Sequence, residues 1–387
     1  MAEVAVREVQ ATSKKLKCGN CDAPVEFDPT AGALKCAFCG STQAIEVDGQ
    51  VVEHSLHEAS LAKHKGYGVS VRKLSCDACG AQISFDPGVV ASKCAFCGSP
   101  RVAETQGEGI RPESLLPFTV TPDQSATLFS KWIKGLWFRP NDLKKLAEVK
   151  EIRGVYLPFW TYDADARSWW TAEAGHYYYV TESYMAVENG RNVSKTRQVR
   201  KVRWVPAHGN RRDIFDDELV YASKGLPRPM VQGIYPFETS KLTPFAPEYL
   251  AGWGAEEAAF GAEEGWGIAK DLMQKEQVDR CSKDVPGDTQ RNLSVSTTFN
   301  GVTFKHALLP IYVSAYAYKG KVFRFLVNGQ SGKTDGEAPL SWAKIALAIL
   351  AVLLVLGGLF FAVNMKNQHG GSSSPSTPSH SEPVRRR

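Results

Sequence analysis

Hydrophobic and polar residues follow different patterns along the chain, and each pattern predicts a different element. Between Thr121 and Leu136 apolar residues recur at helical spacing, after a threonine that can cap a helix and a proline suited to its first turn. A second helical pattern continues from residue 141 to about residue 152. Residues 155–205 are instead rich in aromatic and β-branched residues, which is typical of strands. An Asn-Gly pair at 189–190 divides this run, so a hairpin is expected there.

The following region mixes helix and strand patterns. Residues 255–284 are mostly helical in pattern, although glycines interrupt the first half. An Asn-Gly pair and a Lys-Gly pair further on predict two more hairpins. The run LLPIYVSAYAY at 308–318 resembles YLPFWTYDADA at 156–166, which indicates two related strands. This order of elements predicts an α+β domain over residues 105–340, built on an antiparallel sheet.

Residues 345–363 form an uninterrupted apolar run of 19 residues without a charge. A helix rises about 1.5 Å per residue, so this run spans nearly the ~30 Å thickness of a bilayer's hydrocarbon core. A tryptophan and a lysine precede it, and an asparagine and a lysine follow it, as is typical of membrane interfaces. We therefore expect one membrane-spanning helix near the C-terminal end of the sequence.

Eight of the nine cysteines lie in two copies of one unit. Each copy has two Cys-x-x-Cys pairs with the same gap between them, an FDP tripeptide in that gap, and a CAFCGS run at the second pair. Four thiolates at this spacing suit tetrahedral Zn²⁺, and a complete sulfur shell favours a structural site. Disulfides and iron–sulfur ligation are the less favoured alternatives. The predicted ligands of two structural Zn²⁺ ions are Cys18, Cys21, Cys36 and Cys39, and then Cys76, Cys79, Cys94 and Cys97.

These patterns divide the chain into segments and suggest a compartment. The N-terminal segment lacks an apolar core of signal type, and zinc-binding thiolates must stay reduced. We therefore expect the large N-terminal part in the cytoplasm, at the inner membrane, with a short tail outside. In the linker between the two cysteine units, residues 54–65 favour a short helix. The expected segments are a flexible lead-in (1–15), zinc ribbon 1 (16–46), a linker (47–73), zinc ribbon 2 (74–104), the α+β domain (105–340), the spanning helix with its flanks (341–366) and a disordered tail (367–387).

The charge distribution argues against non-specific binding of nucleic acid by the ribbons. Residues 1–104 contain eleven Lys/Arg and twelve Asp/Glu, and each Zn²⁺ with four thiolates adds a further −2. The loaded pair would carry about −5, whereas affinity for nucleic acid depends largely on neutralising phosphates. The clearest basic feature is an alternating stripe on the predicted return strand. It could be a solvated strand face, or it could bind anionic lipid headgroups or an acidic partner; its residues are Lys195, Arg197, Lys201 and Arg203.

No motif of known catalytic spacing is present in the sequence. Residues 329–334 (GQSGKT) resemble the end of a phosphate-binding loop, but Val327 stands where that motif needs its first glycine. Cys281 is expected to be a packed thiol. Scattered acids and histidines could supply acid–base chemistry, but none forms a recognised motif, so a non-catalytic protein is favoured: Asp163, Asp165, His176, His208, Asp213, Asp216, Asp217 and His306.

Taken together, these motifs resemble a family of bacterial membrane proteins with TFIIB-type zinc ribbons, some of which are labelled primosomal protein N′ or helicase. The matching residues are the two CxxC…CAFCG units, LPFWTYDA at 157–164, YLAGW at 249–253, and the LLP…YKGK…NGQSGKTDGEAPLSW run at 308–342. The resemblance covers nearly the whole chain and implies an architecture more than an activity. The residues do not support the helicase label, because no phosphate-binding loop is present.

The function expected from these features is that of a membrane-anchored, cytosol-facing adaptor or scaffold that binds protein partners through its ribbons. A plausible setting is envelope stress or organisation. The alternative is a nucleic-acid-binding, replication-associated protein at the membrane. Adjacent glycines at 357–358 would allow close helix contact, which leaves a homo-oligomer open.

Overall fold

The computed structural model describes residues 16–47, 49–57, 72–77, 82–85, 96, 102–105, 112–140, 142–143, 152–188, 190–319 and 321–369. The chain divides into two compact units. The first unit comprises Met1–Trp132 and Glu148–Glu337, and the second comprises Ile133–Ala147 and Ala338–Arg387. The first unit has the α+β character that the sequence predicts.

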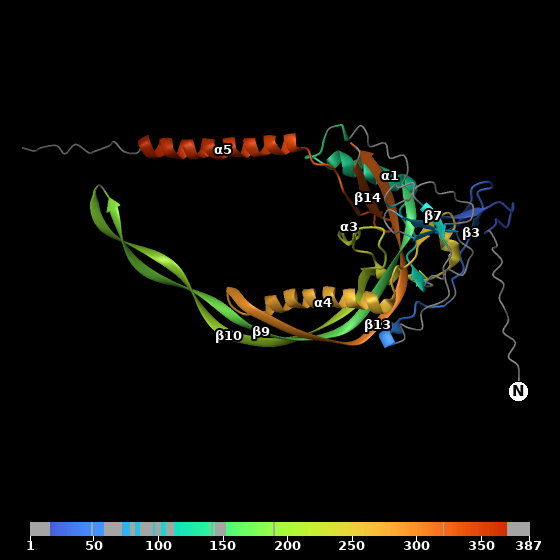
Figure 1. Ribbon diagram of the computed structural model, residues 1–387, viewed down its shortest axis with the longest axis horizontal. Helices are drawn as coiled ribbons and strands as arrows, with labels where there is room; N and C mark the ends of the chain where they lie inside the picture. Colours follow the sequence, from blue (N-terminus) through green and yellow to red (C-terminus); the bar gives the residue numbers. More distant parts are fainter. Residues whose placement is uncertain are drawn as a thin grey trace, which may run out of the picture. The chain divides into compact units, whose positions relative to one another are not determined.

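Three long strands form the centre of the first unit: β9 (Arg153–Glu188), β10 (Arg191–Tyr221) and β13 (Thr289–Tyr318). β9 and β10 make the predicted hairpin and pair antiparallel from Glu188 opposite Arg191 to Phe159 opposite Tyr221, with a bulge between Phe215 and Glu218. β13 pairs antiparallel with the other edge of β9, from Val313 opposite Arg153 to Thr289 opposite Gly175. Beyond Gly175 the hairpin therefore continues as two strands, and Figure 1 shows it extending past the end of β13.

Shorter strands complete this sheet, in which twelve of the described strands take part. Most pairings are antiparallel, as predicted, but β8 runs parallel to β13, and β12 runs parallel to β9. The sheet is therefore mixed, because segments remote in sequence dock beside the long strands. The shorter strands outside the cysteine units are β4 (His54–Ser55), β8 (Ser114–Leu115), β11 (Thr243–Pro244), β12 (Gly254–Glu256), β14 (Lys321–Asn328) and β15 (Thr334–Gly336).

Both faces of β9 are buried near its start. Leu157 and Phe159 belong to one core cluster, whereas Trp160 and Tyr162 belong to another. Burial on both faces explains why this stretch reads as a continuous apolar run rather than as an alternation. The connections after β10 contain α3 (Arg228–Gly233), η2 (Thr239–Lys241) and η3 (Pro247–Leu250).

Helix α4 (Ala262–Asp284) contacts β9, β10 and β13 and covers one of these faces. Ala269 and Met273 pack into the cluster that contains Trp160 and Tyr162. Gly265 has a structural reason, because a Cβ there would lie 2.2 Å from Tyr162 Oη. The glycines that weaken the helical pattern thus include one that lets the helix approach the sheet closely.

Helix α1 (Pro122–Gly135) confirms the first helix predicted from the sequence. Thr121 Oγ1 accepts a hydrogen bond from Gln124 N at 3.2 Å, and Gln124 Oε1 accepts one from Thr121 N at 2.9 Å. This reciprocal pair is a capping box, which satisfies two backbone donors at the start of the helix. Phe129 and Trp132 each lie 4.8 Å from the Phe325 ring of β14. The second predicted helix falls mostly outside the described residues.

The second unit contains α5 (Trp342–His369). Trp342–Ala362 is long and apolar enough to cross a membrane, as the sequence predicts. Lys344 Nζ donates hydrogen bonds to the carbonyl oxygens of Trp137 and Arg139, at 3.2 and 2.8 Å. The predicted lead-in lies outside the described residues, as does the predicted tail from residue 370 onward. At residues 367–369 the expectation of disorder is wrong, because α5 continues to His369.

The cysteine units contribute two groups of short strands. Ribbon 1 is a three-stranded antiparallel sheet of β1 (Val25–Asp28), β2 (Ala33–Cys36) and β3 (Thr42–Gln43). The second cysteine unit (74–104), which also lies in the first compact unit, contributes β5 (Arg72–Cys76), β6 (Gln82–Phe85) and β7 (Val102–Thr105), and β6 pairs with β12 of the main sheet. In the linker, the expectation of a helix is wrong at His54 and Ser55, because β4 pairs with β13.

Candidate metal centre

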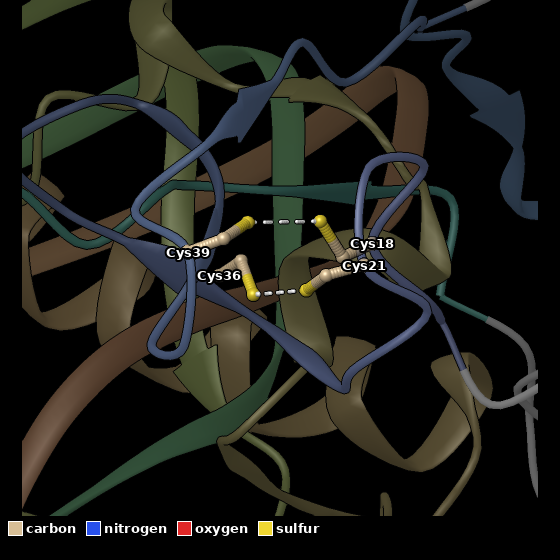
Figure 2. Close-up of side chains that lie close together, drawn as sticks. All are labelled: Cys18, Cys21, Cys36 and Cys39. Carbon is tan, nitrogen blue, oxygen red and sulfur yellow. Dashed lines mark hydrogen bonds between the residues drawn. The ribbon is translucent and has the colours of Figure 1, made fainter.

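Ribbon 1 brings four sulfur atoms together from two turns of the chain. The first Cys-x-x-Cys pair precedes β1, and the second lies at and just after the end of β2. The Sγ atoms of Cys18 and Cys39 are 3.5 Å apart, as are those of Cys21 and Cys36 (Figure 2). All four sulfurs lie within 4.8 Å of one another. A tetrahedron with metal–sulfur bonds of about 2.3 Å has edges of about 3.8 Å, so this group could hold a metal ion.

The two turns around the sulfurs have matching backbone geometry. Asp22 N donates to the Cys18 carbonyl and Gly40 N to the Cys36 carbonyl, each at 2.9 Å. Asp22 and Gly40 both have a positive φ, at 60° and 73°. Glycine adopts this conformation readily, and aspartate is among the few other residues that tolerate it. Asp22 in the first turn therefore adopts the same backbone conformation as Gly40 in the second.

Hydrogen bonding favours the thiolate form of part of this cluster. Ser41 Oγ lies 3.0 Å from Cys18 Sγ and 3.1 Å from Cys39 Sγ. This contact is the main cause that lowers the pKa of Cys39 to about 5, and it also lowers the pKa of Cys18. At Cys21 a backbone hydrogen bond from Ala23 lowers the pKa, but the contacts with the neighbouring Cys36 and Cys39 sulfurs outweigh it, and the net result is a pKa of about 12. A bound dication would oppose the effect of the neighbouring sulfurs, because it stabilises thiolates directly.

The sulfur separations exclude disulfides in this cluster. A disulfide bond is about 2.05 Å long, and none of Cys18, Cys21, Cys36 and Cys39 takes part in one. Cys18 and Cys36 are buried, whereas Cys21 and Cys39 are exposed. One side of the cluster therefore faces solvent. Cys281, expected to be a packed thiol, is fully buried in α4.

Ribbon 1 is held on the body of the first unit by Phe27 of its FDP turn. The Phe27 side chain is 2% exposed, and its ring lies 5.1 Å from the ring of Tyr249, edge to face. Phe27 N donates to the Ala251 carbonyl at 3.0 Å, and Trp253 Nε1 donates to the Phe27 carbonyl at 3.1 Å. The YLAGW run therefore serves as the docking segment for ribbon 1.

The second cysteine unit meets the body differently. Cys76 is buried at the end of β5, and the other three predicted ligands, Cys79, Cys94 and Cys97, lie outside the described residues. Phe96, within the second CAFC run, is fully buried in the same core cluster as Cys76. Arg324 Nε donates a hydrogen bond to the Phe96 carbonyl oxygen at 2.9 Å. The equivalent residue of ribbon 1, Phe38, is 80% exposed.

A second group of charged side chains surrounds Lys305 of β13. The Lys305 ammonium lies 2.7 Å from Asp217 and 3.0 Å from Glu53. Asp163, Asp216 and Asp217 each place an oxygen within 4.8 Å of the others. Burial, together with the hydrogen bond to Glu53, raises the pKa of Asp163 to about 7, while the same hydrogen bond lowers that of Glu53 to about 2. The Lys305 ammonium already neutralises part of the negative charge that a metal ion would neutralise, so we interpret this group as a structural ion cluster rather than a metal site.

The other candidate acids and histidines are dispersed over the sheet. Asp165 pairs with Arg212, and Asp213 pairs with Arg211 and Arg280. His306 is buried against the Trp160 ring. His176 and His208 lie on the hairpin strands, opposite Arg203 and Thr171. The structure therefore brings together only three residues of that candidate set, Asp163, Asp216 and Asp217.

Strand β10 places the four cations of the basic stripe on one face of the hairpin. They alternate along the strand, opposite Tyr184, Glu182, Tyr178 and His176 of β9, in the order Lys195, Arg197, Lys201 and Arg203. Glu182 lies 3.0 Å from Lys201 and 3.7 Å from Arg197, and Glu188 lies 2.7 Å from Lys195. These pairs are exposed, and such pairs typically contribute only ~0–1 kcal/mol. Three of the four stripe cations are therefore ion-paired, and each pair contributes little to stability.

Sequence reasoning missed Glu53, Lys305 and the different exposure of Phe38 and Phe96. Lys305 had a signal, because a lysine inside the apolar run of β13 needs a buried carboxylate. Glu53 had none, since it lies in a linker far from Lys305 in sequence. The two phenylalanines stand in identical CAFCGS runs, so only tertiary structure separates them.

Comparison with known proteins supplies one relative and no activity. The chain is 26% identical over 363 residues to a protein of Bacillus subtilis (strain 168) described as uncharacterized protein YdjG. The match covers 89% of this chain and 98% of that protein. No family model matches the chain. No solved structure matches it either.

Proposed function

We propose that the protein is a membrane-anchored adaptor that presents a zinc-loaded ribbon to a protein partner at the cytoplasmic face of the inner membrane. Cys18, Cys21, Cys36 and Cys39 would hold one Zn²⁺, and a shell of four thiolates leaves no position for substrate. The repeated spacing assigns a second structural Zn²⁺ to Cys76, Cys79, Cys94 and Cys97. The apolar helix Trp342–Ala362 would anchor the chain. The cytoplasmic location rests on the reduced state that zinc thiolates require.

The observation that carries this proposal is the different fate of one phenylalanine in the two copies. Phe96 is fully buried against the body, whereas Phe38 at the same place in ribbon 1 is 80% exposed. The surrounding module is docked on the YLAGW segment through Phe27. A large, pre-organised aromatic side chain in solvent is typical of the anchor residue of a protein interface.

The surroundings of Phe96 indicate the chemistry of a pocket that would accept Phe38. Phe96 belongs to a core cluster that includes the aliphatic residues Leu116 and Leu326, and Arg324 donates a hydrogen bond to the Phe96 carbonyl. The tetrathiolate centre beside Phe38 would carry a charge of −2 when loaded with Zn²⁺. A partner with an apolar pocket and an arginine or lysine at its rim would match both features.

The proposal includes no catalytic role. The four-sulfur shell is closed, and Lys305 neutralises part of the acidic group around Asp163. The proposal also does not require nucleic acid, since three of the four stripe cations are ion-paired within the hairpin. Both statements concern the described part of the chain.

A site-specific cross-linking experiment tests the adaptor role. A photo-reactive phenylalanine analogue is placed at Phe38, at Phe96, or at Val52, which is exposed but outside the cysteine turns, in the full chain in its native membrane. We expect position 38 to give a discrete intermolecular adduct that disappears in a Cys21→Ser background. Position 96 should give only adducts within the chain. Identical adducts from positions 38 and 52 would contradict the proposal.

A further inference from the structure

The outer part of the β9–β10 hairpin has no third strand among the described residues. The pairing of β13 with β9 ends at Gly175, so residues 176–203 form a two-stranded ribbon, which we name the free hairpin (Figure 1). Each of its strands has 13 residues between Gly175 and the turn, or about 43 Å at ~3.3 Å per residue. A two-stranded hairpin is at best marginally stable in water. The free hairpin therefore gains most from a surface that covers one of its faces.

Most of the chain's excess charge lies on this hairpin. It contains six Lys/Arg and two Asp/Glu, a net charge of +4, whereas the whole chain carries +5. The pairing register places five of the six cations on one face, which we name the stripe face: Arg191, Lys195, Arg197, Lys201 and Arg203. Arg200 is the one hairpin cation on the opposite face.

The stripe face also carries amphipathic and apolar side chains between its cations. Tyr178 lies directly opposite Lys201, and Tyr184 directly opposite Lys195. Both tyrosines are exposed, at 45% and 41%, and Val193 near the turn is 38% exposed. Tyrosines are enriched at the headgroup level of bilayers, and lysine and arginine are attracted to anionic leaflets.

We propose that the stripe face lies on the headgroups of an anionic lipid bilayer. The stripe face carries cations along its whole length, from Arg191 to Arg203, so it would meet the many phosphates that a bilayer surface presents. The chain's own apolar helix keeps the hairpin at a high local concentration near a bilayer. Glu182 and Glu188 weaken the attraction by pairing with three cations. We therefore expect the stripe face to bind anionic membranes in preference to neutral ones, and to bind more weakly as the salt concentration rises.

Hydrogen exchange on the full-length protein in lipid nanodiscs tests this proposal. Peptides covering residues 176–203 are followed in discs of phosphatidylcholine alone and in discs with about 30% phosphatidylglycerol. We expect slower exchange of these peptides only in the anionic discs, and we expect 0.5 M salt to remove the difference. Glu182→Gln with Glu188→Gln raises the hairpin charge from +4 to +6. At about 1 kcal/mol per charge this change should strengthen the protected state by about twentyfold or more.

The matched loss variant combines Lys195→Gln, Arg197→Gln and Lys201→Gln. Its control replaces three exposed lysines of α4, Lys270, Lys275 and Lys283, and should behave like the parent protein. Unchanged exchange in residues 153–175 shows that the body is still folded in each variant. Equal protection in neutral and anionic discs would overturn the proposal. So would protection by added polyglutamate or poly-uridine RNA in neutral discs without any effect of phosphatidylglycerol, because those results would assign the face to an acidic polypeptide or a nucleic acid.

Discussion

Replacing Phe27 with alanine should release ribbon 1 from the body without breaking its metal cluster directly. Phe27 is 2% exposed and packs edge to face on Tyr249 at 5.1 Å. Truncating a buried phenylalanine to alanine costs about 3–5 kcal/mol. The flanking hydrogen bonds use only the Phe27 backbone, with Ala251 and Trp253 as partners, so they are not deleted with the ring. Most of the loss should therefore appear as easier opening of this one contact.

The assay is hydrogen exchange of peptides from residues 16–47 and 249–253 in the full chain. Each 1.4 kcal/mol changes an equilibrium tenfold, so a loss of about 3 kcal/mol should raise the opening equilibrium roughly a hundredfold. Phe38→Ala is the matched control, since the same change in the same module removes a side chain that is 80% exposed. It should alter stability by no more than about 0.5 kcal/mol. Equal effects of the two substitutions, or no effect of Phe27→Ala on residues 249–253, would refute the docking argument.

Four further predictions follow from single sites. Cys21→Ser should lower the bound zinc of the purified protein by about one equivalent in elemental analysis, whereas Cys281→Ser should retain all of it; equal losses would contradict the ligand assignment. Burial and the hydrogen bond to Glu53 raise the pKa of Asp163 from 3.8 to about 7. The stabilisation from its proton is full below pH 4 and is lost as the pH rises through 7, so Asp163→Asn should remove about 1–2 kcal/mol of stability change between pH 5 and 8 in thermal unfolding. Asp22 has a φ of 60°, so Asp22→Ala should destabilise ribbon 1 by about 1 kcal/mol more than Asp22→Gly in hydrogen exchange. A chain ending at Ser341 should leave the membrane fraction for the soluble fraction, and its retention would show that α5 is not the main anchor.

The features that the sequence predicts well are those encoded by neighbouring residues. The capping box at Thr121 and Gln124, the Asn-Gly turn at 189–190 and the apolar run of α5 each lie within one element. The four sulfurs of ribbon 1 also meet as the spacing predicts, because the FDP turn and a short hairpin bring the two pairs together. The second zinc site stays a prediction, since three of its ligands lie outside the described residues.

The features that the sequence could not supply depend on contacts between remote segments. β6 pairs with β12, about 170 residues away, and β12 runs parallel to β9. No local pattern in GAE at 254–256 announces either partner. The Lys305 cluster has the same origin, because Glu53 reaches it from a linker that reads as connecting chain. The antiparallel pairing was therefore predictable from the hairpins β9–β10 and β13–β14. The hairpin predicted at Asn300-Gly301 is wrong, because these residues form an irregularity inside the continuous strand β13. The parallel pairings of β8 and β12 had no local signal.

One short segment explains how two copies of the same module came to differ. Ala251 and Trp253 bind the Phe27 backbone of ribbon 1, and two residues later β12 pairs with β6 of the second cysteine unit. A β-strand offers its hydrogen-bonding groups along its edges, so β12 can extend the sheet through only one of the two modules. The second cysteine unit pairs with that edge, and its Phe96 is buried. Ribbon 1 instead docks through the Phe27 ring and two isolated backbone hydrogen bonds. The exposure of Phe38 is thus a consequence of geometry at residues 249–256 and not of the CAFCGS sequence, which both copies share.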